Sequence, residues 1–171
     1  ISLFAIDLQK ANIYDKKKEK QLVFAPHAID NKRFAESRNR EALKIRANFS
    51  IKDEDILILF AGKLEAIKNP LLLLSAFKNI RKHGIHLAFV GNGALEENLK
   101  TTVKRSEIKN VHFMDFQNQT QMPAIYQACD LFCLPSKSET WGLAINEAMA
   151  CGKAILTSDK VGCAEDLVDF E

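Results

Sequence analysis

The sequence predicts an α/β fold, a doubly wound parallel sheet with helices on both faces. Short apolar runs alternate with helix-like segments along most of the 171 residues, and this alternation is typical of a parallel sheet. Polar or glycine-rich loops follow four of these runs, at the edge where ligands bind in such sheets. The length suits one well-filled domain, and no internal repeat or low-complexity tract interrupts it.

Six short apolar runs are expected to form the strands. Each is bounded by turn residues or by a charged segment, and the strongest reads ILILFAG. The alternation with helical segments predicts that these strands run parallel. The expected strands are residues 22–25, 56–62, 86–93, 111–114, 130–136 and 154–158.

The segments between the strands carry helix start and stop signals. Residues 69–84 are expected to form a helix, with Pro70 in its first turn and Gly84 as its stop. Pro123 likewise suits the first turn of a short helix. The other expected helices are residues 95–105, a helix that begins near residue 142, and the start of a further helix at 164–171.

The composition excludes several classes of protein. With 47% hydrophobic and 27% charged residues, the chain reads as neither disordered nor fibrous. No apolar stretch approaches the roughly 20 residues that span a bilayer, and no signal-peptide pattern opens the chain. The chain begins without methionine, so it is expected to be a piece of a longer protein. The four cysteines lack a metal-type spacing and are expected to be reduced thiols in a cytosolic protein.

Partners cannot be assigned from the net charge, which is +2. The densest basic run is DKKKEK, at residues 15–20. It is compatible with contact to nucleic acid or to an anionic membrane, but a solvated loop is the better interpretation, and no nucleic-acid partner is expected.

Candidate chemistry gathers in the loops that follow the strands. These loops read GKLEAIKN, GNG, DFQN and SKSETWG. In an open parallel sheet the carboxyl ends of the strands lie at one edge, and ligands bind there, where the strand order reverses. The four loops therefore predict a binding site at that edge.

The stretch SKSETWGLAINEAMACG, residues 136–152, carries two glutamates across the start of a helix. The free N–H groups of Gly142 to Ala144 and the helix dipole favour an anion, and a phosphate is the natural occupant. Glu139 and Glu147 are then placed to hold two other parts of the same ligand. The alternative is that Glu139 only favours the helix start and that Glu147 is a surface residue.

Phosphates need compensating cations, and the loop after the strongest strand offers Lys63 and Lys68. The alternative is that both lysines are solvated. GNGALEE lacks the third glycine of the dinucleotide fingerprint, so no nicotinamide or flavin cofactor is predicted. The four histidines form no metal-binding pattern, and no metal is predicted.

Together these motifs resemble the C-terminal, donor-binding domain of a retaining GT-B glycosyltransferase of family 4, the glycosyl transferases group 1. ETWGLAINE is similar to the E-x7-E motif of that family, and AMACGKAILTSD to the run that follows it. GKLEAIKN resembles the phosphate-binding loop, APHAIDNKRF the interdomain segment, and IYQACDLFCLPSKSE the run into the motif. The resemblance extends from about Pro26 to Val168 and implies a Rossmann-like sheet that is one half of a two-domain GT-B fold.

The resemblance also implies a role for the motif residues. Lys63 and Lys68 would bind the diphosphate of a nucleotide-sugar donor, and the backbone amides of Gly142 and Leu143 would complete the phosphate site. This donor is a substrate, so no cofactor is implied.

The resemblance assigns the two carboxylates to different sugars. Glu139 would position the donor sugar at the catalytic centre, and Glu147 would hold the ribose hydroxyls. Backbone near Phe116, in the segment FMDFQN, would contact the nucleobase.

Three positions depart from the family pattern. Lys63 stands where arginine is usual, which gives up a planar bidentate contact for a point charge. Asp115 and Ala28 each replace a usual glycine.

The implied protein is larger than this chain. Residues 1–21 are expected to be the tail of an interdomain or N-terminal segment, and 22–171 a donor-binding domain truncated at its C-terminus. The acceptor, a glycan or lipid-linked glycan, would bind through the missing N-terminal domain, so the chain alone is expected to be inactive.

The expected activity of the whole protein is metal-independent transfer of a sugar, with retention of configuration, in polysaccharide or lipopolysaccharide biosynthesis. The expected location is the cytoplasm, with a peripheral contact at the inner face of the cell membrane. The alternatives are a nucleotide-sugar epimerase on the same two-domain plan, and a non-catalytic domain that binds a nucleotide sugar or a partner.

Overall fold

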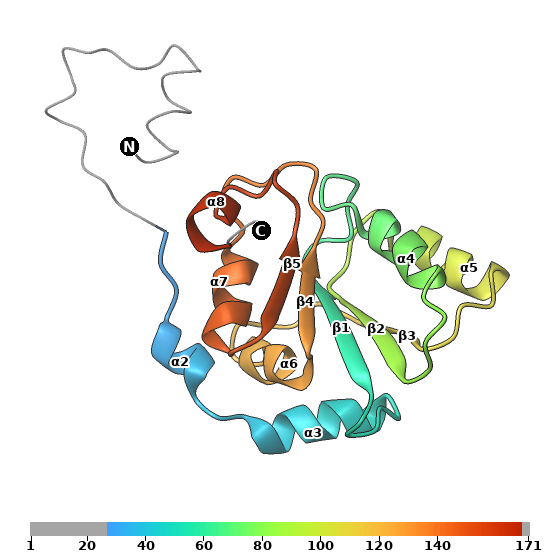
Figure 1. Cartoon of the computed structure of the whole chain (residues 1–171), viewed down its shortest axis with the longest axis horizontal. Coiled ribbons are helices and arrows are strands. Elements are labelled where there is room, and N and C mark those ends of the chain that lie inside the picture. Colours follow the sequence, from blue (N-terminus) through green and yellow to red (C-terminus); the bar gives the residue numbers. More distant parts are fainter. Residues whose placement is uncertain (1–26, 169–171) are drawn as a thin grey trace, which may run out of the picture.

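The computed structural model describes residues 27–168, which form a parallel sheet with helices on both faces (Figure 1). The sheet has five strands in the order β3-β2-β1-β4-β5, and every pairing between neighbours is parallel. The expected strand at 22–25 lies outside the described residues. The strands are β1 (Ile56–Ala61), β2 (Ile85–Val90), β3 (Val111–Met114), β4 (Leu131–Leu134) and β5 (Ala154–Thr157).

The helices divide between the two faces according to the strands that they connect. The sheet grows from β1 to β3 in one direction through α4 (Pro70–Lys78) and α5 (Glu96–Arg105), which lie together on one side (Figure 1). It then continues from β4 to β5 in the other direction through α6 (Met122–Ala128) and α7 (Leu143–Ala150). Because parallel crossovers are right-handed, reversing the direction moves the helices to the opposite face. The predicted doubly wound, Rossmann-like parallel sheet is confirmed.

Two helices that the sequence analysis did not predict precede the sheet. α2 (Asn31–Ala35) is capped by the Asp30 side chain, which accepts a hydrogen bond of 3.1 Å from the backbone N–H of Arg33. α3 (Asn39–Asn48) buries only Ala42 and Arg46, so its sequence lacks the apolar stripe by which a helix is recognised. α2, α3, α6 and α7 pack against one another.

α4 is shorter than its expected range, although it begins at Pro70 as predicted. It ends at Lys78, and Asn79 forms the cap. Gly84, expected as the helix stop, instead lies just before β2 with φ +70°. A Cβ there would lie 2.6 Å from Oδ1 of Asp55, so the glycine marks a tight turn into a strand. The last helix, α8 (Ala164–Leu167), begins at the expected residue.

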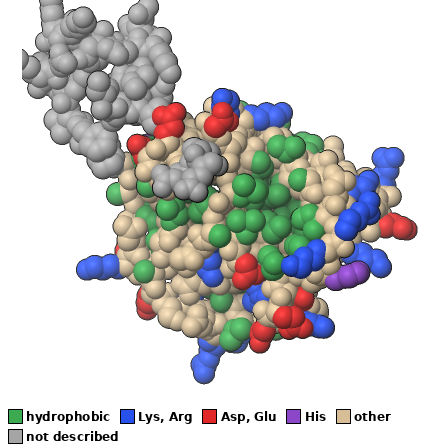
Figure 2. Space-filling model, in the orientation of Figure 1, with side chains coloured by type: hydrophobic (Ala, Val, Ile, Leu, Met, Phe, Trp, Pro, Cys, Tyr) green, Lys and Arg blue, Asp and Glu red, His purple; other side chains and the backbone are tan. Residues whose placement is uncertain are grey.

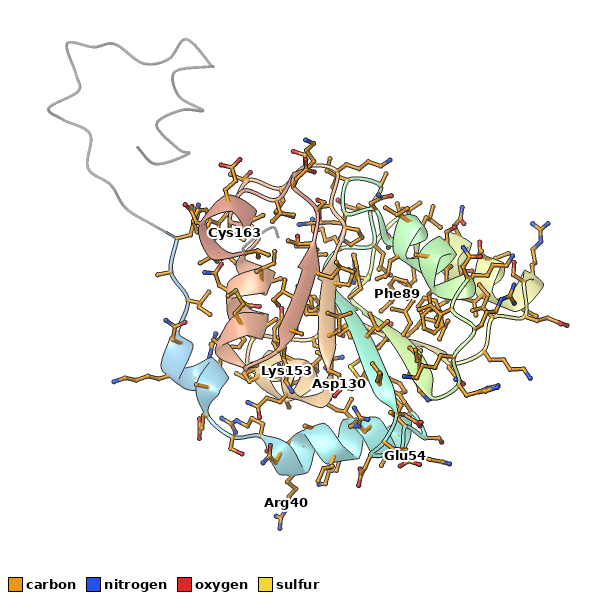
Figure 3. All side chains as sticks on the ribbon, in the orientation of Figure 1. Arg40, Glu54, Phe89, Asp130, Lys153 and Cys163 are labelled. Carbon is orange, nitrogen blue, oxygen red and sulfur yellow. The ribbon has the colours of Figure 1, made fainter. Side chains whose placement is uncertain are left out.

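Aromatic side chains fill the layer between the sheet and α4 and α5. Phe89, labelled in Figure 3, is fully buried, and its ring centroid lies 5.6 Å from that of Phe60 and 5.5 Å from that of Phe113. Lys100 of α5 lies over the Phe113 ring at 5.8 Å. On the other face Tyr126 meets Phe132 edge to face at 5.5 Å. Both layers are therefore packed around rings carried by the strands and α6.

The surface seen in Figure 2 carries a central group of hydrophobic side chains, with charged side chains around its margin. Exposed large apolar residues on the elements described above include Leu72 of α4 and Leu156 of β5. β5 is an edge strand, because within the described residues it pairs only with β4.

The four cysteines are free thiols, as the sequence predicted. Cys163, labelled in Figure 3, is fully buried, and burial raises the pKa of its thiol to about 11. Burial also raises the pKa of Cys129 to about 12. Thiols held protonated in this way are poor nucleophiles, so they act as small packing groups.

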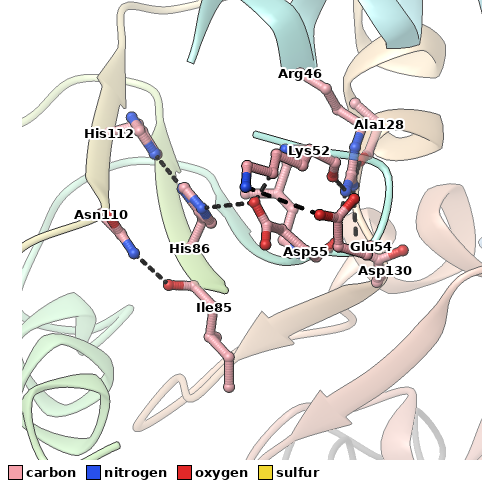
Figure 4. A network of polar contacts seen from close by, with 11 residues as sticks. Arg46, Lys52, Glu54, Asp55, Ile85, His86, Asn110, His112, Ala128 and Asp130 are labelled. Carbon is pink, nitrogen blue, oxygen red and sulfur yellow. Dashed lines mark hydrogen bonds and ion pairs between the residues drawn. The ribbon is translucent and has the colours of Figure 1, made fainter. Parts of the chain in front are cut away.

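A buried arginine joins the elements at the amino end of the sheet (Figure 4). Arg46 donates to the carbonyl oxygens of Lys52 and Asp55, at 2.7 and 2.6 Å, and to the Asp130 carboxylate at 3.2 Å. The same Asp130 oxygen accepts a hydrogen bond of 2.7 Å from the backbone N–H of Leu57. One side chain therefore fastens α3 to the starts of both β1 and β4.

Two histidines extend this network across β2 and β3 (Figure 4). Nδ1 of His86 lies 2.9 Å from Nε2 of His112, and Nε2 of His86 lies 3.4 Å from Oδ2 of Asp55. The His112 ring also stacks on Phe49 with centroids 4.5 Å apart. Burial and the neighbouring His86 lower the pKa of His112 to about 4. Folded His112 therefore stays neutral at a pH where unfolded histidine is charged.

This depressed pKa predicts a loss of stability in mild acid. Between about pH 6.5 and pH 4 the unfolded chain binds a proton at residue 112 that the folded chain does not bind, so stability falls as pH falls through that window. We expect the free energy of unfolding to drop between pH 7 and pH 4.5 by about 1 to 2 kcal/mol more in the parent than in His112→Gln, after allowance for solvent screening. Urea unfolding at both pH values measures this difference, and equal drops would contradict it.

Candidate functional site

A cavity of about 450 Å³ lies at the carboxyl ends of β1 and β4, where the direction of strand order reverses. These two strands pair through only two residue pairs, Ile58 with Leu131 and Leu59 with Phe132. Beyond them each strand pairs only with its outer neighbour, so the loops separate. The lining residues are His27, Ala61, Gly62, Lys63, Lys68, Leu134, Glu139, Thr140, Trp141, Gly142, Leu143 and Ala144.

Both predicted lysines line this cavity, in different surroundings. The Lys63 side chain is 74% exposed, and its Nζ lies 3.9 Å from Oε1 of Glu65. Lys68 is only 23% exposed, and its Nζ contacts Oε2 of Glu139 in an ion pair. The structure thus brings together Lys63, Lys68 and Glu139, as the sequence analysis expected.

Opposing influences act on the pKa of Lys68. Burial lowers its pKa below the ordinary value of 10.5, the Glu65 carboxylate opposes this shift, and the charge of Lys63 adds to it. The direct contact with the Glu139 carboxylate favours the charged form. Lys68 is therefore a half-buried ammonium group whose hydration is partly replaced by a carboxylate.

The loop that carries Glu139 is held by backbone hydrogen bonds on both sides. The Lys137 N–H donates to the carbonyl of Ile67 at 2.8 Å, which joins this loop to the Lys68 loop. On its other side Glu139 forms a parallel bridge to Val161, and the Gly162 N–H donates to the Glu139 carbonyl at 3.0 Å. These contacts fix the backbone from which the Glu139 side chain enters the cavity.

Two glycines permit the close approach of this loop to the segment 158–163. Gly142, immediately before α7, has φ +94°, and a Cβ there would lie 2.6 Å from Cγ1 of Val161. A Cβ on Gly162 would lie 2.1 Å from the carbonyl oxygen of Thr140. Larger residues cannot occupy these positions without moving the cavity wall.

The N-terminus of α7 opens into the same cavity. The Ile145 N–H is bound to the Gly142 carbonyl at 2.8 Å, whereas within residues 27–168 the N–H groups of Leu143 and Ala144 have no hydrogen-bond partner. Free amides at a helix N-terminus bind anions. Gly142 and Leu143 both line the cavity, and their predicted contact with a phosphate stays a prediction.

Glu147 lies outside this cavity lining and inside the protein. It is 8% exposed, so the alternative interpretation of a surface residue is wrong. Its Oε2 accepts a hydrogen bond of 2.8 Å from the Tyr126 hydroxyl, and its Oε1 accepts one of 3.2 Å from Nε2 of Gln119. Burial and the Glu147 charge raise the pKa of Tyr126 well above 10, which keeps this donor protonated. The predicted contact of Glu147 with ribose stays a prediction.

Phe116 lies in the loop after β3 and is 69% exposed. It is not among the residues that line the cavity. The same loop nevertheless reaches Glu147 through Gln119, whose Oε1 accepts a hydrogen bond of 3.0 Å from Arg33. The predicted contact between Phe116 and a nucleobase also stays a prediction.

Two aromatic residues of the cavity wall were not assigned by the sequence analysis. Trp141 lines the cavity and also packs against the core. Its Nε1 donates to Oδ1 of Asn146 at 3.0 Å. His27 lies at least 34 residues along the chain from every other residue that lines the cavity, so no local pattern could have indicated it.

The described part of the chain offers no cluster of three or more His, Cys, Asp or Glu side chains that could hold a metal ion. Among these residues no helix is long and apolar enough to cross a membrane.

Comparison with known proteins identifies the family. Residues 41–171 match the family described as glycosyl transferases group 1. The chain belongs to this family. The matched range contains the Lys63 and Lys68 loop and the whole stretch from Glu139 to Glu147.

Curated relatives are similar over most of this chain but are much longer. The D-inositol 3-phosphate glycosyltransferase of Segniliparus rotundus is 32% identical over 124 residues, which are 68% of this chain and 27% of the relative. The lipopolysaccharide 1,2-N-acetylglucosaminetransferase of Salmonella typhimurium is 34% identical over 136 residues, which are 73% of this chain and 36% of the relative. The chain therefore spans about a quarter to a third of these relatives.

A solved structure shows the same fold. The crystal structure of Alr3699/HepE from Anabaena, in complex with UDP and glucose, matches with a TM-score of 0.72 at 22% identity. The match covers 84% of this chain and 39% of that chain. The described domain therefore corresponds to less than half of that protein.

The close approach at Gly162 generates a stability prediction. In Gly162→Ala the added carbon would overlap the Thr140 carbonyl, and we expect the free energy of unfolding to fall by about 1 to 3 kcal/mol. Urea unfolding of the variant and the parent measures the change. Lys160→Ala is the matched control, because that side chain is exposed on the same segment. A Gly162→Ala variant as stable as the parent would show that the two segments are not in close contact.

Proposed function

We propose that this chain is the donor-binding domain of a glycosyltransferase that transfers a sugar from a nucleotide diphosphate sugar to an acceptor hydroxyl. The observation that carries the proposal is the cavity at the strand switch point, where two lysines, one carboxylate and two free helix amides converge. Membership of the glycosyl transferases group 1 family supports sugar transfer, and the UDP and glucose bound to the Anabaena protein support a nucleotide-sugar donor.

The diphosphate is proposed to lie between the lysines and the start of α7. Lys63 and Lys68 supply charge, and the N–H groups of Leu143 and Ala144 supply directed donors. When the sugar leaves, negative charge grows on the diphosphate. Fixed cations and amides at that point stabilise the departing group, and this is the contribution of this domain to the rate.

The two glutamates are proposed to hold different hydroxyl groups. Glu139 enters the cavity beside Lys68 and would accept hydrogen bonds from the donor sugar. Glu147 would bind the ribose, and Tyr126 and Gln119 hold its carboxylate in one orientation. Ribose hydroxyls would then replace or add to the 3.2 Å contact with Gln119, the longer of the two.

The remainder of the reaction is assigned to parts of the whole protein outside this chain. Because the chain spans about a quarter to a third of its relatives, we propose that a further domain binds the acceptor glycan or lipid-linked glycan. We propose retention of configuration, and a place in polysaccharide or lipopolysaccharide synthesis at the inner face of the cell membrane. The Salmonella relative, a lipopolysaccharide transferase by name, supports this pathway.

Titration with nucleotides tests the proposed function. UDP, ADP and GDP are each titrated calorimetrically into the 171-residue chain in buffer with EDTA. We expect at least one of them to bind without metal, because lysines and helix amides already provide the positive potential that a cation would supply. The proposal fails if none of the three binds, and the metal-independent part of it fails if binding requires added Mg²⁺.

Substitutions of the two glutamates are expected to affect different ligands. Glu147→Gln should weaken the diphosphate and the corresponding nucleotide sugar alike, by roughly 1 to 3 kcal/mol for a lost charged hydrogen bond. Glu139→Gln should not weaken the diphosphate, because it removes a negative charge beside Lys68, and it should weaken only the nucleotide sugar. Each variant is titrated with both ligands, and thermal melting checks that it is folded. If both variants bind both ligands like the parent, neither carboxylate contacts a sugar.

A further inference from the structure

His27 contributes an imidazole to the wall of the cavity. It comes from the segment before α2, whereas the other lining residues belong to the ends of β1 and β4, to the loops that follow them and to the start of α7. Its side chain is exposed, and its ring centroid lies 5.3 Å from that of Trp141, with the planes tilted by 33°. The imidazole therefore lies beside the start of α7, where the free amides are.

The Trp141 ring of this contact is held in place, and the segment that carries His27 leads into a packed helix. The Trp141 indole is fixed by its hydrogen bond to Asn146, and its carbonyl accepts one of 2.9 Å from Cys163. On the other side, α2 begins shortly after His27 and buries Phe34 completely. The Phe34 carbonyl accepts a hydrogen bond of 3.1 Å from Gln127 of α6. His27 thus precedes a packed helix, and its ring lies against the Trp141 indole.

The charged groups of the cavity do not fully compensate a diphosphate, so a further hydrogen-bond donor would stabilise it. Lys63 and Lys68 bring two positive charges, and Glu139 cancels one of them. The diphosphate of a nucleotide sugar carries two negative charges, one on each phosphate. The N-terminus of α7 offsets roughly half a charge, so roughly half a charge remains uncompensated. Lys63 is also largely exposed beside Glu65, which weakens its share.

We propose that His27 is a diphosphate-binding residue of this site, and that its imidazole N–H donates a hydrogen bond to a phosphate oxygen. A neutral imidazole has one N–H to donate, and an imidazolium has two and a full charge. The indole of Trp141 orients the ring and attracts it when it is charged. The proposal rests on the proposed function, because it assigns a further contact to the same ligand.

The test compares phosphate-dependent binding in matched variants of the 171-residue chain. UDP, ADP, GDP and their nucleosides are titrated into the parent, His27→Phe, His27→Gln and Lys68→Ala. Phenylalanine keeps a ring against Trp141 but has no N–H, whereas glutamine keeps a donor. His83→Phe is the control, because His83 is an exposed histidine in the loop before β2, away from the cavity lining.

We expect His27→Phe to weaken the best-bound diphosphate about tenfold and to leave the nucleoside unchanged, as for a lost hydrogen bond to a charged group. His27→Gln should recover part of the affinity, and His83→Phe should match the parent. Diphosphate binding by His27→Phe equal to that of the parent, or an equal loss for nucleoside and diphosphate, would overturn the assignment. A parent that binds no diphosphate refutes the proposed function itself. If the parent binds and Lys68→Ala weakens the diphosphate more than the nucleoside, the failure belongs to the assignment of His27 alone.

Discussion

The site depends on the short pairing between β1 and β4. These strands join the two halves of the sheet, yet they pair through only two residue pairs. Right-handed crossovers send the chain after β1 to one face and the chain after β4 to the other, so their loops diverge and leave a cavity. At the opposite end Asp130 accepts from Leu57 and Arg46, which fastens the amino ends of the same strands. A closed amino end and an open carboxyl end together shape the cavity.

Rigidity of the cavity wall comes from backbone rather than from side chains. Glu139 is carried by a loop that bonds to Ile67 through Lys137 on one side and to the 158–163 segment on the other. The absence of a Cβ at Gly142 and Gly162 allows this approach. A binding group on a continuously hydrogen-bonded backbone loses little conformational entropy when a ligand binds. A loop can therefore hold the Glu139 carboxylate in a fixed position.

The sequence predicts the features that depend on neighbouring residues, and it misses those that depend on contacts between distant segments. Apolar runs and a proline in the first turn of a helix, as at Pro70, are local signals. They predicted the five described strands and most of the helices near the positions where the structure has them. α3 was missed because its buried members include Arg46, a polar residue whose burial depends on distant carbonyl acceptors.

The same distinction applies to the candidate site. The lysine loop and the helix start were placed by motif, and they do meet in one cavity. The burial of Glu147 against Tyr126 and the approach of His27 to Trp141 are contacts between distant segments, which no spacing encodes.

The Lys68–Glu139 ion pair explains how one site can hold both a lysine and a carboxylate beside the proposed diphosphate. A half-buried ammonium group without a partner would be costly, and Glu139 offsets that cost. Lysine has three N–H donors, so Lys68 can keep its carboxylate and still bind a phosphate oxygen. The same pairing lowers the net positive charge that the proposed diphosphate would meet. In the proposed complex, the additional donors around the cavity, the α7 amides and His27, would then decide how strongly the anion is held.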